Sequence, residues 1–184
     1  MRHVPHPVAI ITSTDPRNGS DSPARGMTVS SFNTVSLSPS PIISFNVRRP
    51  SETLAALLLS DRFLVHLLAP NLRTAALARA FSRGNNTRTE LEDFEFTQYL
   101  SEEGKVPLSL PLLREKEEHA KGSDIPFVLE CKVHQQVQVN DHTVVLGQVL
   151  HTLGQIAESR RSEADELCLT YADTRFWRMG DQID

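Results

Sequence analysis

The segment Arg48-Arg49-Pro50-Ser51-Glu52-Thr53 carries the groups from which proteins build phosphate sites. It places two guanidiniums and a capping hydroxyl, that of Ser51, at the predicted start of a helix. Free backbone N–H groups at a helix start bind anions, and arginine adds charge-assisted hydrogen bonds to phosphate. Glu52 opposes this chemistry, because a carboxylate in the first turn repels phosphate unless it points outward. The segment predicts a phosphate site, and the alternative is an ordinary capped helix with solvated arginines.

A hydroxyl-rich segment, residues 27–37, precedes this site and is predicted to form one continuous strand. Alternation gives one face with Met27, Val29, Ser31, Asn33, Val35 and Leu37, and an opposite face with Thr28, Ser30, Phe32, Thr34 and Ser36. Short hydroxyls beside backbone N–H groups suit the ribityl chain and pyrimidine edge of a flavin, and the alternative is a half-exposed strand whose hydroxyls meet water. We expect this strand to neighbour the strand that leads into the phosphate segment, so together they predict a mononucleotide site.

Histidine offers the remaining candidate for catalysis. His142 follows the predicted turn Asn140-Asp141, and we assign it a polar role near the reacting groups, although a histidine beside a tight turn is more often a surface residue. His66 lies within an apolar strand and is predicted to be a core or interface histidine with satisfied hydrogen bonds. His3 and His6 have no further ligand near them in the sequence, so no metal site is predicted.

Composition and missing motifs exclude several classes of protein. The 184 residues fit a single domain over residues 1–184, and the net charge of −4 argues against a general nucleic-acid binder. No GxGxxG, P-loop or GxSxG motif is present, which argues against a Rossmann domain, a nucleotide triphosphatase and an α/β-hydrolase. No membrane span or signal peptide is visible. Cys131 and Cys168 are expected to be buried, reduced thiols of a cytoplasmic protein, or of an organellar one if an N-terminal segment is missing.

Short β-rich runs bounded by turn residues dominate the chain. Strands are predicted over residues 8–13, 27–37, 42–47, 63–68, 127–133, 135–139, 143–150, 167–171 and 175–179. Helices are predicted after the caps Ser51 and Asn71, the second ending near residue 83 with Gly84 as its C-cap. Residues 85–124 are less regular and are expected to form helix or a lid. Because strands follow one another at both ends of the chain, a closed antiparallel barrel with helical additions is favoured.

Several ordered motifs are similar to those of a known family. They are the run from Arg25 to Leu37, the run from Ile43 to Val47 with Ser51 and Thr53, the strand from Arg62 to Leu68, and the later runs Leu129–Val133 and Asp141–Val149. As a set, from Val8 to about Leu150, they resemble the flavin reductase-like, FMN-binding split-barrel family. The chain departs from the family in Pro39-Ser40-Pro41, which stands in place of a Pro-Pro pair, and in residues 85–124.

The resemblance implies a mainly β fold with α additions, an antiparallel split β-barrel, which binds FMN, or FAD, and uses NAD(P)H as electron donor. It implies a flavin held chiefly by Ser30 and Ser31, within a strand whose candidate binding residues are Thr28, Val29, Ser30, Ser31, Asn33 and Ser36. It implies phosphate contacts from Asn46, Arg48, Ser51 and Thr53. It places His142 near the isoalloxazine and nicotinamide, and it implies a homodimer with the flavin near the subunit interface.

These observations predict an oxidoreductase that transfers hydride from NAD(P)H to FMN, as a flavin reductase whose product serves an oxygenase partner or another acceptor. Three alternatives stay open. They are an FMN-binding flavoprotein that does not use NAD(P)H (an oxidase, oxygenase or electron carrier), a non-enzymatic split barrel that binds a ligand or mediates dimerisation, and an activity like that of pyridoxamine phosphate oxidase. Neither nucleic acid nor membrane is expected as a partner.

Overall fold

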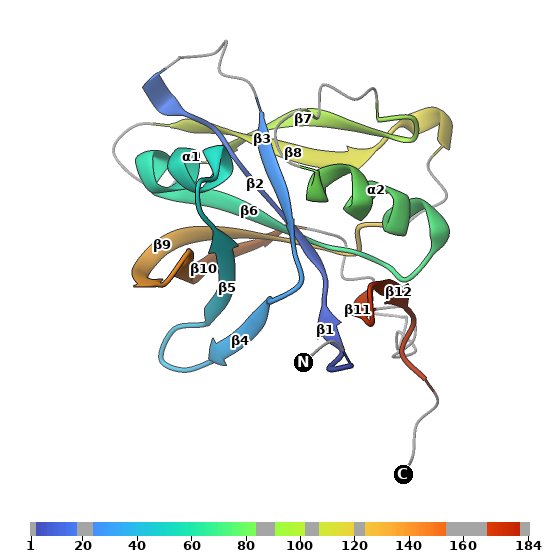
Figure 1. Cartoon of the computed structure of the whole chain (residues 1–184). Coiled ribbons are helices and arrows are strands. Elements are labelled where there is room, and N and C mark those ends of the chain that lie inside the picture. Colours follow the sequence, from blue (N-terminus) through green and yellow to red (C-terminus); the bar gives the residue numbers. More distant parts are fainter. Residues whose placement is uncertain are drawn as a thin grey trace.

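The computed structural model describes residues 3–17, 24–83, 91–101, 107–119, 124–153 and 169–180. The described part is mainly β, as expected, with two α-helices (Figure 1). Its strands are β1 (His6–Pro7), β2 (Ala9–Ser13), β3 (Arg25–Val29), β4 (Asn33–Ser36), β5 (Ile42–Arg48), β6 (Arg62–Leu67), β7 (Phe94–Ser101), β8 (Leu108–Glu115), β9 (Phe127–Val139), β10 (His142–Leu153), β11 (Thr170–Ala172) and β12 (Arg175–Trp177). The helices are α1 (Glu52–Ser60) and α2 (Leu72–Ser82), and a short 3-10 turn spans Glu117–His119.

Seven of these strands form one antiparallel sheet in the order β3-β2-β6-β9-β10-β5-β4. β3 and β4 follow one another in the chain but lie at the two ends of this order, so the sheet must curl to bring its ends together (Figure 1). Among the described strands no ladder joins β3 to β4. The described sheet therefore forms a split barrel. The consecutive strands in the sequence had favoured a closed one.

The prediction of one strand over residues 27–37 is wrong. The backbone leaves strand geometry between β3 and β4, because β3 pairs with β2 whereas β4 pairs with β5. Ser31 fixes this bend, since its Oγ accepts a hydrogen bond of 2.8 Å from the backbone N–H of Asn46. After the bend, the apolar residues that alternation placed on one face are not buried. Val35 is 55% exposed and Leu37 is 77% exposed.

Residues 127–139 form the single strand β9, where two strands were predicted. The pairing of β9 with β10 shifts its register after Val133, at the position where the first of the two predicted strands ended. The predicted turn Asn140-Asp141 joins β9 to β10, and Asn140 takes the left-handed conformation with φ of 49°. Its carbonyl and that of Asp141 both accept hydrogen bonds from Arg49, which ties this turn to the segment before α1.

The described part of residues 85–124 contains the β7–β8 hairpin where helix was one of the two expectations, and the other, a lid, stays a prediction. Pro111 lies within β8, and proline is tolerated there because β8 pairs with β7 alone and its other edge carries no ladder. The hairpin is attached to the main sheet by buried hydrogen bonds. Thr12 donates to the carbonyl of Pro111 at 2.6 Å, and the N–H of Leu113 donates to His66 Nε2 at 3.0 Å.

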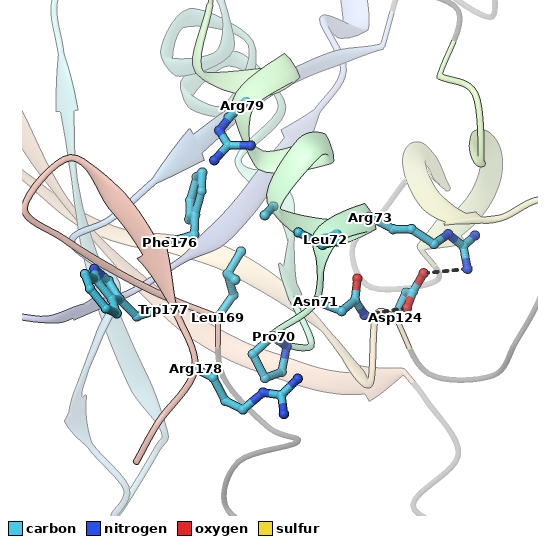
Figure 2. Close-up of a pocket in the computed structure, with 11 residues that line it drawn as sticks. Pro70, Asn71, Leu72, Arg73, Arg79, Asp124, Leu169, Phe176, Trp177 and Arg178 are labelled. Atoms are coloured by element: carbon cyan, nitrogen blue, oxygen red, sulfur yellow. Dashed lines mark hydrogen bonds and ion pairs between the residues drawn. The ribbon is translucent and has the colours of Figure 1, made fainter.

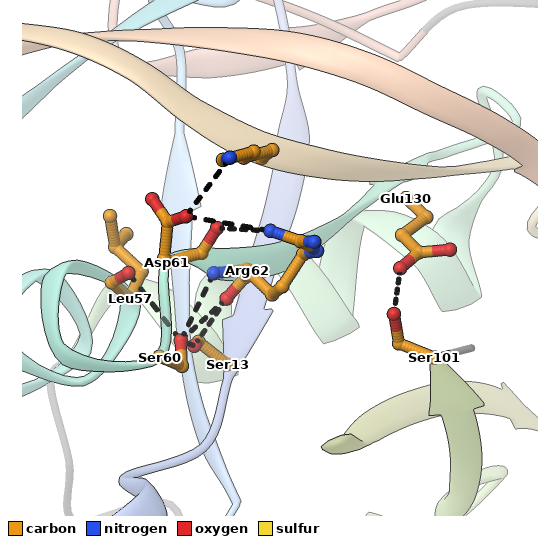
Figure 3. Close-up of polar contacts among 8 residues, drawn as sticks. Ser13, Leu57, Ser60, Asp61, Arg62, Ser101 and Glu130 are labelled. Carbon is orange, nitrogen blue, oxygen red and sulfur yellow. Dashed lines mark hydrogen bonds and ion pairs between the residues drawn. The ribbon is translucent and has the colours of Figure 1, made fainter. Parts of the chain in front are cut away.

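Glu130 makes a second attachment of the hairpin. Its carboxylate is fully buried and accepts hydrogen bonds from the hydroxyls of Tyr99 (2.9 Å) and Ser101 (Figure 3). A buried carboxylate without such donors would be costly, because no water replaces its hydration. The two hydroxyls therefore compensate the buried carboxylate of Glu130, and they attach β7 to β9.

The main core fills the inside of the curled sheet and extends to α1. Phe45 and Phe63 meet edge to face there, with ring centroids 5.5 Å apart, and Cys131 lies among the same buried side chains. Burial raises the pKa of the Cys131 thiol, so it stays neutral, as predicted; Cys168 lies outside the described residues. A second cluster, which includes Ala78, Phe81 and Leu169, packs α2 against β2 and the C-terminal strands.

Both helices begin where the sequence predicted. The Oγ of Ser51 accepts from the N–H of Leu54 at 3.2 Å, and Asn71 forms a capping box with Thr74. Arg83 caps the end of α2, and Gly84 lies outside the described residues. Neither helix has the length and apolar character that a membrane crossing requires.

α1 ends at Asp61, whose φ of 58° reverses the chain into β6. The hydroxyls of Ser13 and Ser60 both donate to the carbonyl of Arg62 there, at 2.9 and 2.7 Å (Figure 3). The carboxylate of Asp61 lies 3.5 Å from Arg62 Nη1 and 3.6 Å from Lys132 Nζ. These contacts fix the C-terminal end of α1, and the helix packs against β2, β3 and β6.

Candidate nucleotide-binding site

A pocket of about 370 Å³, here called the α1 pocket, lies where β3, β5 and the start of α1 meet. It is lined by Gly26, Met27, Thr28, Val29, Asn46, Val47, Arg48, Pro50, Ser51, Glu52, Thr53, Phe81 and Ser82. Six of the ten predicted cofactor-binding residues are among them: Thr28, Val29, Asn46, Arg48, Ser51 and Thr53. The two segments meet as predicted, but through the curl of the sheet, because β3 and β5 are not neighbours in the strand order.

The start of α1 lines this pocket with groups that are able to bind an anion. Ser51 uses one lone pair to cap the helix, while the sulfur of Met27 at 3.8 Å is a weak acceptor for its proton. That proton is therefore available to a phosphate oxygen. The N–H of Leu54 is bonded to Ser51, whereas those of Glu52 and Thr53 have no acceptor within the helix. Together these donors suit a phosphate.

The charged side chains around the pocket form ion pairs that are exposed to solvent. Glu52, which raised the objection of repulsion, is 66% exposed and lies 3.6 Å from Arg25, so its charge is partly neutralised. Arg48 is 80% exposed, and its Nε lies 3.3 Å from Asp141 Oδ2. Exposed ion pairs of this kind are weak, so the contact with Asp141 does not hinder Arg48 from binding an anion.

His142 lies beside Arg48, its partner in the β10–β5 ladder. Its Nδ1 donates to Asp141 Oδ1 at 2.7 Å, and this hydrogen bond holds the pKa of the Asp141 carboxyl below its usual value, with Arg48 lowering it further. The side chain is 45% exposed. His142 does not line the α1 pocket or either pocket described below.

A second pocket of about 280 Å³, the bridging pocket, continues from the first. It is lined by Val8, Thr28, Ser30, Arg79, Ser82, Tyr171, Thr174 and Phe176. Thr28 and Ser82 line both pockets, and Thr28 Oγ1 donates to the carbonyl of Ala78 at 2.7 Å, which holds β3 against α2. Ser30 thus lines a pocket next to that of the predicted phosphate residues, and the pockets that share residues in this way are together called the groove.

A third and larger pocket, the α2 pocket of about 620 Å³, lies between α2 and β12 (Figure 2). It shares Arg79 and Phe176 with the bridging pocket, and the guanidinium of Arg79 lies over the ring of Phe176 at 5.2 Å. The three pockets therefore follow one another in the order α1, bridging, α2. Their shared residues come from β3, α2 and β12.

Three predicted binding residues lie outside these pockets. Ser31 supports the bend before β4, Asn33 is exposed on β4, and Ser36 donates to the carbonyl of Ser38 at 3.0 Å. Their inclusion followed from treating residues 27–37 as one straight strand. The bend carries Asn33 and Ser36 away from β3, so the structure does not bring them together with Thr28 and Val29.

Sequence reasoning missed the residues that α2 contributes. Phe81 and Ser82 line the α1 pocket from the last turn of this helix, and Arg79 lines the other two pockets. The spacing of apolar residues predicts that a helix forms. It does not predict which end of the helix approaches β3. Gly26 was a usable signal: a Cβ there would come within 2.5 Å of the Phe81 ring, so only glycine allows this approach.

The residues present fit a flavin mononucleotide. The start of α1, the hydroxyls of Ser51 and Thr53 and the guanidinium of Arg48 suit its phosphate. Val29, Val47 and Phe81 supply apolar surface. Among the described residues no group of three or more His, Cys, Asp or Glu is placed to hold a metal ion.

Comparison with known proteins agrees with this chemistry. The NADH:FMN oxidoreductase of Rhodococcus erythropolis is 28% identical over 153 residues, which cover 83% of this chain and 67% of that protein. The solved structure of the NADH:FAD oxidoreductase of Streptomyces globisporus has a TM-score of 0.66 at 26% identity, covering 99% of this chain and 85% of that one.

The fold also matches nitrilotriacetate monooxygenase component B from Mycobacterium thermoresistibile, with a TM-score of 0.67 at 21% identity over 97% of this chain and 82% of that one. This likeness shows the fold. The family match is broader, since the sequence pattern of the flavin reductase like domain covers residues 1–180. The chain therefore belongs to the flavin reductase like domain family.

Proposed function

We propose that this protein is an NAD(P)H-dependent flavin reductase that transfers a hydride from the nicotinamide to FMN. The observation that carries the proposal is the α1 pocket, in which a capped helix start, Ser51, Thr53 and Arg48 meet the hydroxyl and apolar groups of β3. The family and the relatives described as NADH:FMN and NADH:FAD oxidoreductases support it. A flavin, when bound, supplies the redox chemistry, and the protein supplies binding and orientation.

Each part of the groove has its own task in this proposal. The start of α1 binds the flavin phosphate, while Thr28, Val29 and Ser30 lie along the rest of the flavin. The bridging pocket, where Ser30, Phe176 and Tyr171 come together, is where the nicotinamide meets the flavin. No strong acid or base is required, because a hydride passes directly between the two ring systems.

His142 has a supporting role in the proposal. Because its Nδ1 donates to Asp141, the neutral ring keeps Nε2 as an acceptor for an N–H or hydroxyl of a bound nucleotide. The same carboxylate contacts Arg48, so the residues near the phosphate and the histidine are connected through Asp141.

We further propose that the protein works in the cytoplasm as a homodimer that supplies reduced flavin to an oxygenase. The exposed apolar residues Val35 and Leu37 near the sheet end at β4, and Val137 and Val139 on the outer part of β9, offer surface that a second copy would cover. A structural neighbour described as a monooxygenase component supports an oxygenase partner. Light scattering after size-exclusion chromatography tests the dimer, which a monomeric mass would exclude.

Steady-state oxidation of NADH and NADPH, with FMN or riboflavin as acceptor, tests the proposed activity. We expect oxidation that depends on added flavin, with a KM for FMN at least about tenfold below that for riboflavin, because riboflavin lacks the phosphate that α1 binds. Absence of flavin-dependent oxidation with both nucleotides would contradict the proposal. Equal KM values for the two flavins would contradict the assignment of the phosphate site.

A further inference from the structure

We propose that Phe96, on the β7–β8 hairpin, is a positioning residue of the flavin site, because it holds the ring of Phe81 in the wall of the α1 pocket. The inference rests on the proposed function, since it names a residue that sets the affinity of that pocket for flavin. None of the described residues of the hairpin lines any of the three pockets, so Phe96 acts on the site only through another side chain.

Phe81 forms part of the wall of the α1 pocket, although its side chain is almost fully buried. It is 1% exposed and enters the wall from the last turn of α2, where it lies against Gly26 of β3. The contact is so close that a Cβ on Gly26 would come within 2.5 Å of Cε1 and 2.8 Å of Cδ1 of the Phe81 ring. Gly26 lines the same pocket, so the place of this ring relative to β3 decides how far the pocket extends.

The ring of Phe81 makes a second contact, with the half-buried Phe96 of β7. The two ring centroids are 5.9 Å apart and the ring planes are at 89° to each other, which is the edge-to-face arrangement that aromatic pairs favour. Such a pair favours one orientation of each ring, whereas an aliphatic neighbour would fill the space without that preference. The position of Phe81 therefore depends on β3, through Gly26, and on the hairpin, through Phe96.

The hairpin that carries Phe96 is attached to the main sheet through both of its strands. Thr12, which pairs with Gly26 in the β2–β3 ladder, donates to the carbonyl of Pro111 in β8 at 2.6 Å. On the other strand, two hydroxyls of β7 donate to the buried carboxylate of Glu130. Buried hydrogen bonds are costly to break, and here several of them share the attachment. The place of Phe96 therefore does not depend on a single contact.

Phe94 provides the comparison that separates positioning from ordinary core packing. It lies two residues before Phe96, hence on the same face of β7, and it belongs to the same buried cluster as Phe81. Its ring, however, faces the guanidinium of Arg73 at 5.4 Å. If Phe96 served the core alone, replacing either ring of β7 would lower stability and leave the affinity for flavin unchanged. If Phe96 positions Phe81, only the replacement of Phe96 changes that affinity.

Fluorescence titration of FMN and riboflavin tests the proposal on matched variants. Phe96→Leu should bind both flavins about three- to tenfold more weakly than wild type, the range that an edge-to-face contact is worth. The loss should be equal for the two flavins, because Phe81 offers only apolar surface and not a phosphate contact. Phe94→Leu should bind them like wild type, and Phe96→Tyr, which keeps the ring, should stay within about twofold of wild type. Leucine and tyrosine keep the apolar bulk, and urea denaturation establishes that each variant is folded.

Steady-state kinetics supply a readout that a loss of stability alone does not move. In Phe96→Leu the KM for flavin should rise about three- to tenfold, while the KM for NADH changes by less than about twofold. The reason is that the described residues of the hairpin do not line the bridging pocket, where the nicotinamide meets the flavin in the proposed function. An equal rise in both KM values would indicate a general loss of structure and would overturn the positioning role.

The titrations also separate this inference from the proposed function. Wild-type affinity in Phe96→Leu, or equal losses in Phe96→Leu and Phe94→Leu, would overturn the positioning role and leave the proposed function standing. A loss in Phe96→Tyr as large as that in Phe96→Leu would overturn it too, because the tyrosine variant retains the ring. If wild-type protein itself binds neither flavin, the proposed function fails together with the inference.

Discussion

The rim of the α1 pocket and the junction of β2, β6 and β8 use polar side chains in opposite ways. At the rim, Arg48, Asp141 and His142 are all exposed by 45% or more, and their contacts exchange easily with solvent. At the junction, His66 is fully buried, its Nδ1 donating to the carbonyl of Ile10 at 3.2 Å and its Nε2 accepting from Leu113. Groups that must release one partner to accept a ligand are exposed, whereas groups that hold the sheet together are buried and fully hydrogen-bonded.

This contrast has an energetic basis. Removing one partner of a buried hydrogen bond leaves the other unsatisfied at a cost of about 1–3 kcal/mol, whereas exposed ion pairs contribute about 0–1 kcal/mol. Substitutions at the junction should therefore affect the free energy of unfolding, and substitutions at the rim should affect ligand affinity. The following predictions, from the largest effect to the smallest, test that division.

Replacing His66 should give the largest effect, on stability. His66→Ala leaves the Leu113 N–H and the Ile10 carbonyl without partners and opens a cavity, so we expect the free energy of unfolding to fall by about 3–5 kcal/mol. Urea denaturation measures it. In a variant that still folds, the dissociation constant for FMN should change little, because His66 lies outside the three pockets. A loss below about 1 kcal/mol would contradict the role given to this histidine.

The same residue should make stability depend on pH. Burial lowers the pKa of His66 from 6.5 to about 4 in the folded protein. Below pH 6.5 the unfolded chain binds a proton that the folded chain does not, so stability falls as pH decreases to about 4, by roughly 3 kcal/mol in total. His66→Gln should lack this part of the dependence. Denaturation at several pH values checks it, and identical slopes for both proteins would exclude His66 as the source.

At the rim, Arg48→Ala should weaken FMN binding by about tenfold, leaving riboflavin binding unchanged, because only FMN carries a phosphate. Stability should change by less than about 1 kcal/mol, since Arg48 is exposed. Fluorescence titration of both flavins measures the effect. Arg114→Ala, on β8 and outside the pockets, removes an exposed arginine as a control. Equal weakening of FMN and riboflavin would place the phosphate elsewhere.

The smallest effect is expected from Asp141→Asn, and it has the opposite sign. Removing the carboxylate frees Arg48 from its ion pair, so FMN should bind about two- to threefold more tightly at low salt. The gain should shrink as ionic strength rises. Titrations at low and high salt concentration measure it, and weaker FMN binding at both would show that Asp141 supports the site instead of competing for Arg48.

The sequence was a good guide where a local rule decides the structure and a poor one where distant segments meet. Ser51 and Asn71 start their helices as predicted because capping depends on residues three positions apart. His66 was correctly predicted to be a satisfied core residue, although its partners could not be known. The bend at Ser31 was missed because its cause is Asn46, on another strand.

The candidate site shows the same division. Residues of the helix start were predicted together, and the structure brings Arg48, Ser51 and Thr53 into one pocket. Asn33 and Ser36 were grouped with Thr28 because residues 27–37 were predicted to form one strand, and the bend separates them. Gly26 signals that another element approaches β3, but it does not identify Arg79 and Ser82, which reach the groove only because the second core packs α2 against β2.

The central claim, that this protein reduces a bound flavin with a nicotinamide nucleotide, is tested most directly by absorption spectroscopy without oxygen. Protein mixed with one equivalent of FMN is titrated with NADH and, separately, with NADPH, while the flavin absorbance near 450 nm is followed against FMN without protein. We expect the absorbance to be lost in the presence of protein with at least one of the two nucleotides. Flavin that binds but stays oxidised with both would contradict the reductase function and favour a flavoprotein that takes its electrons from another donor.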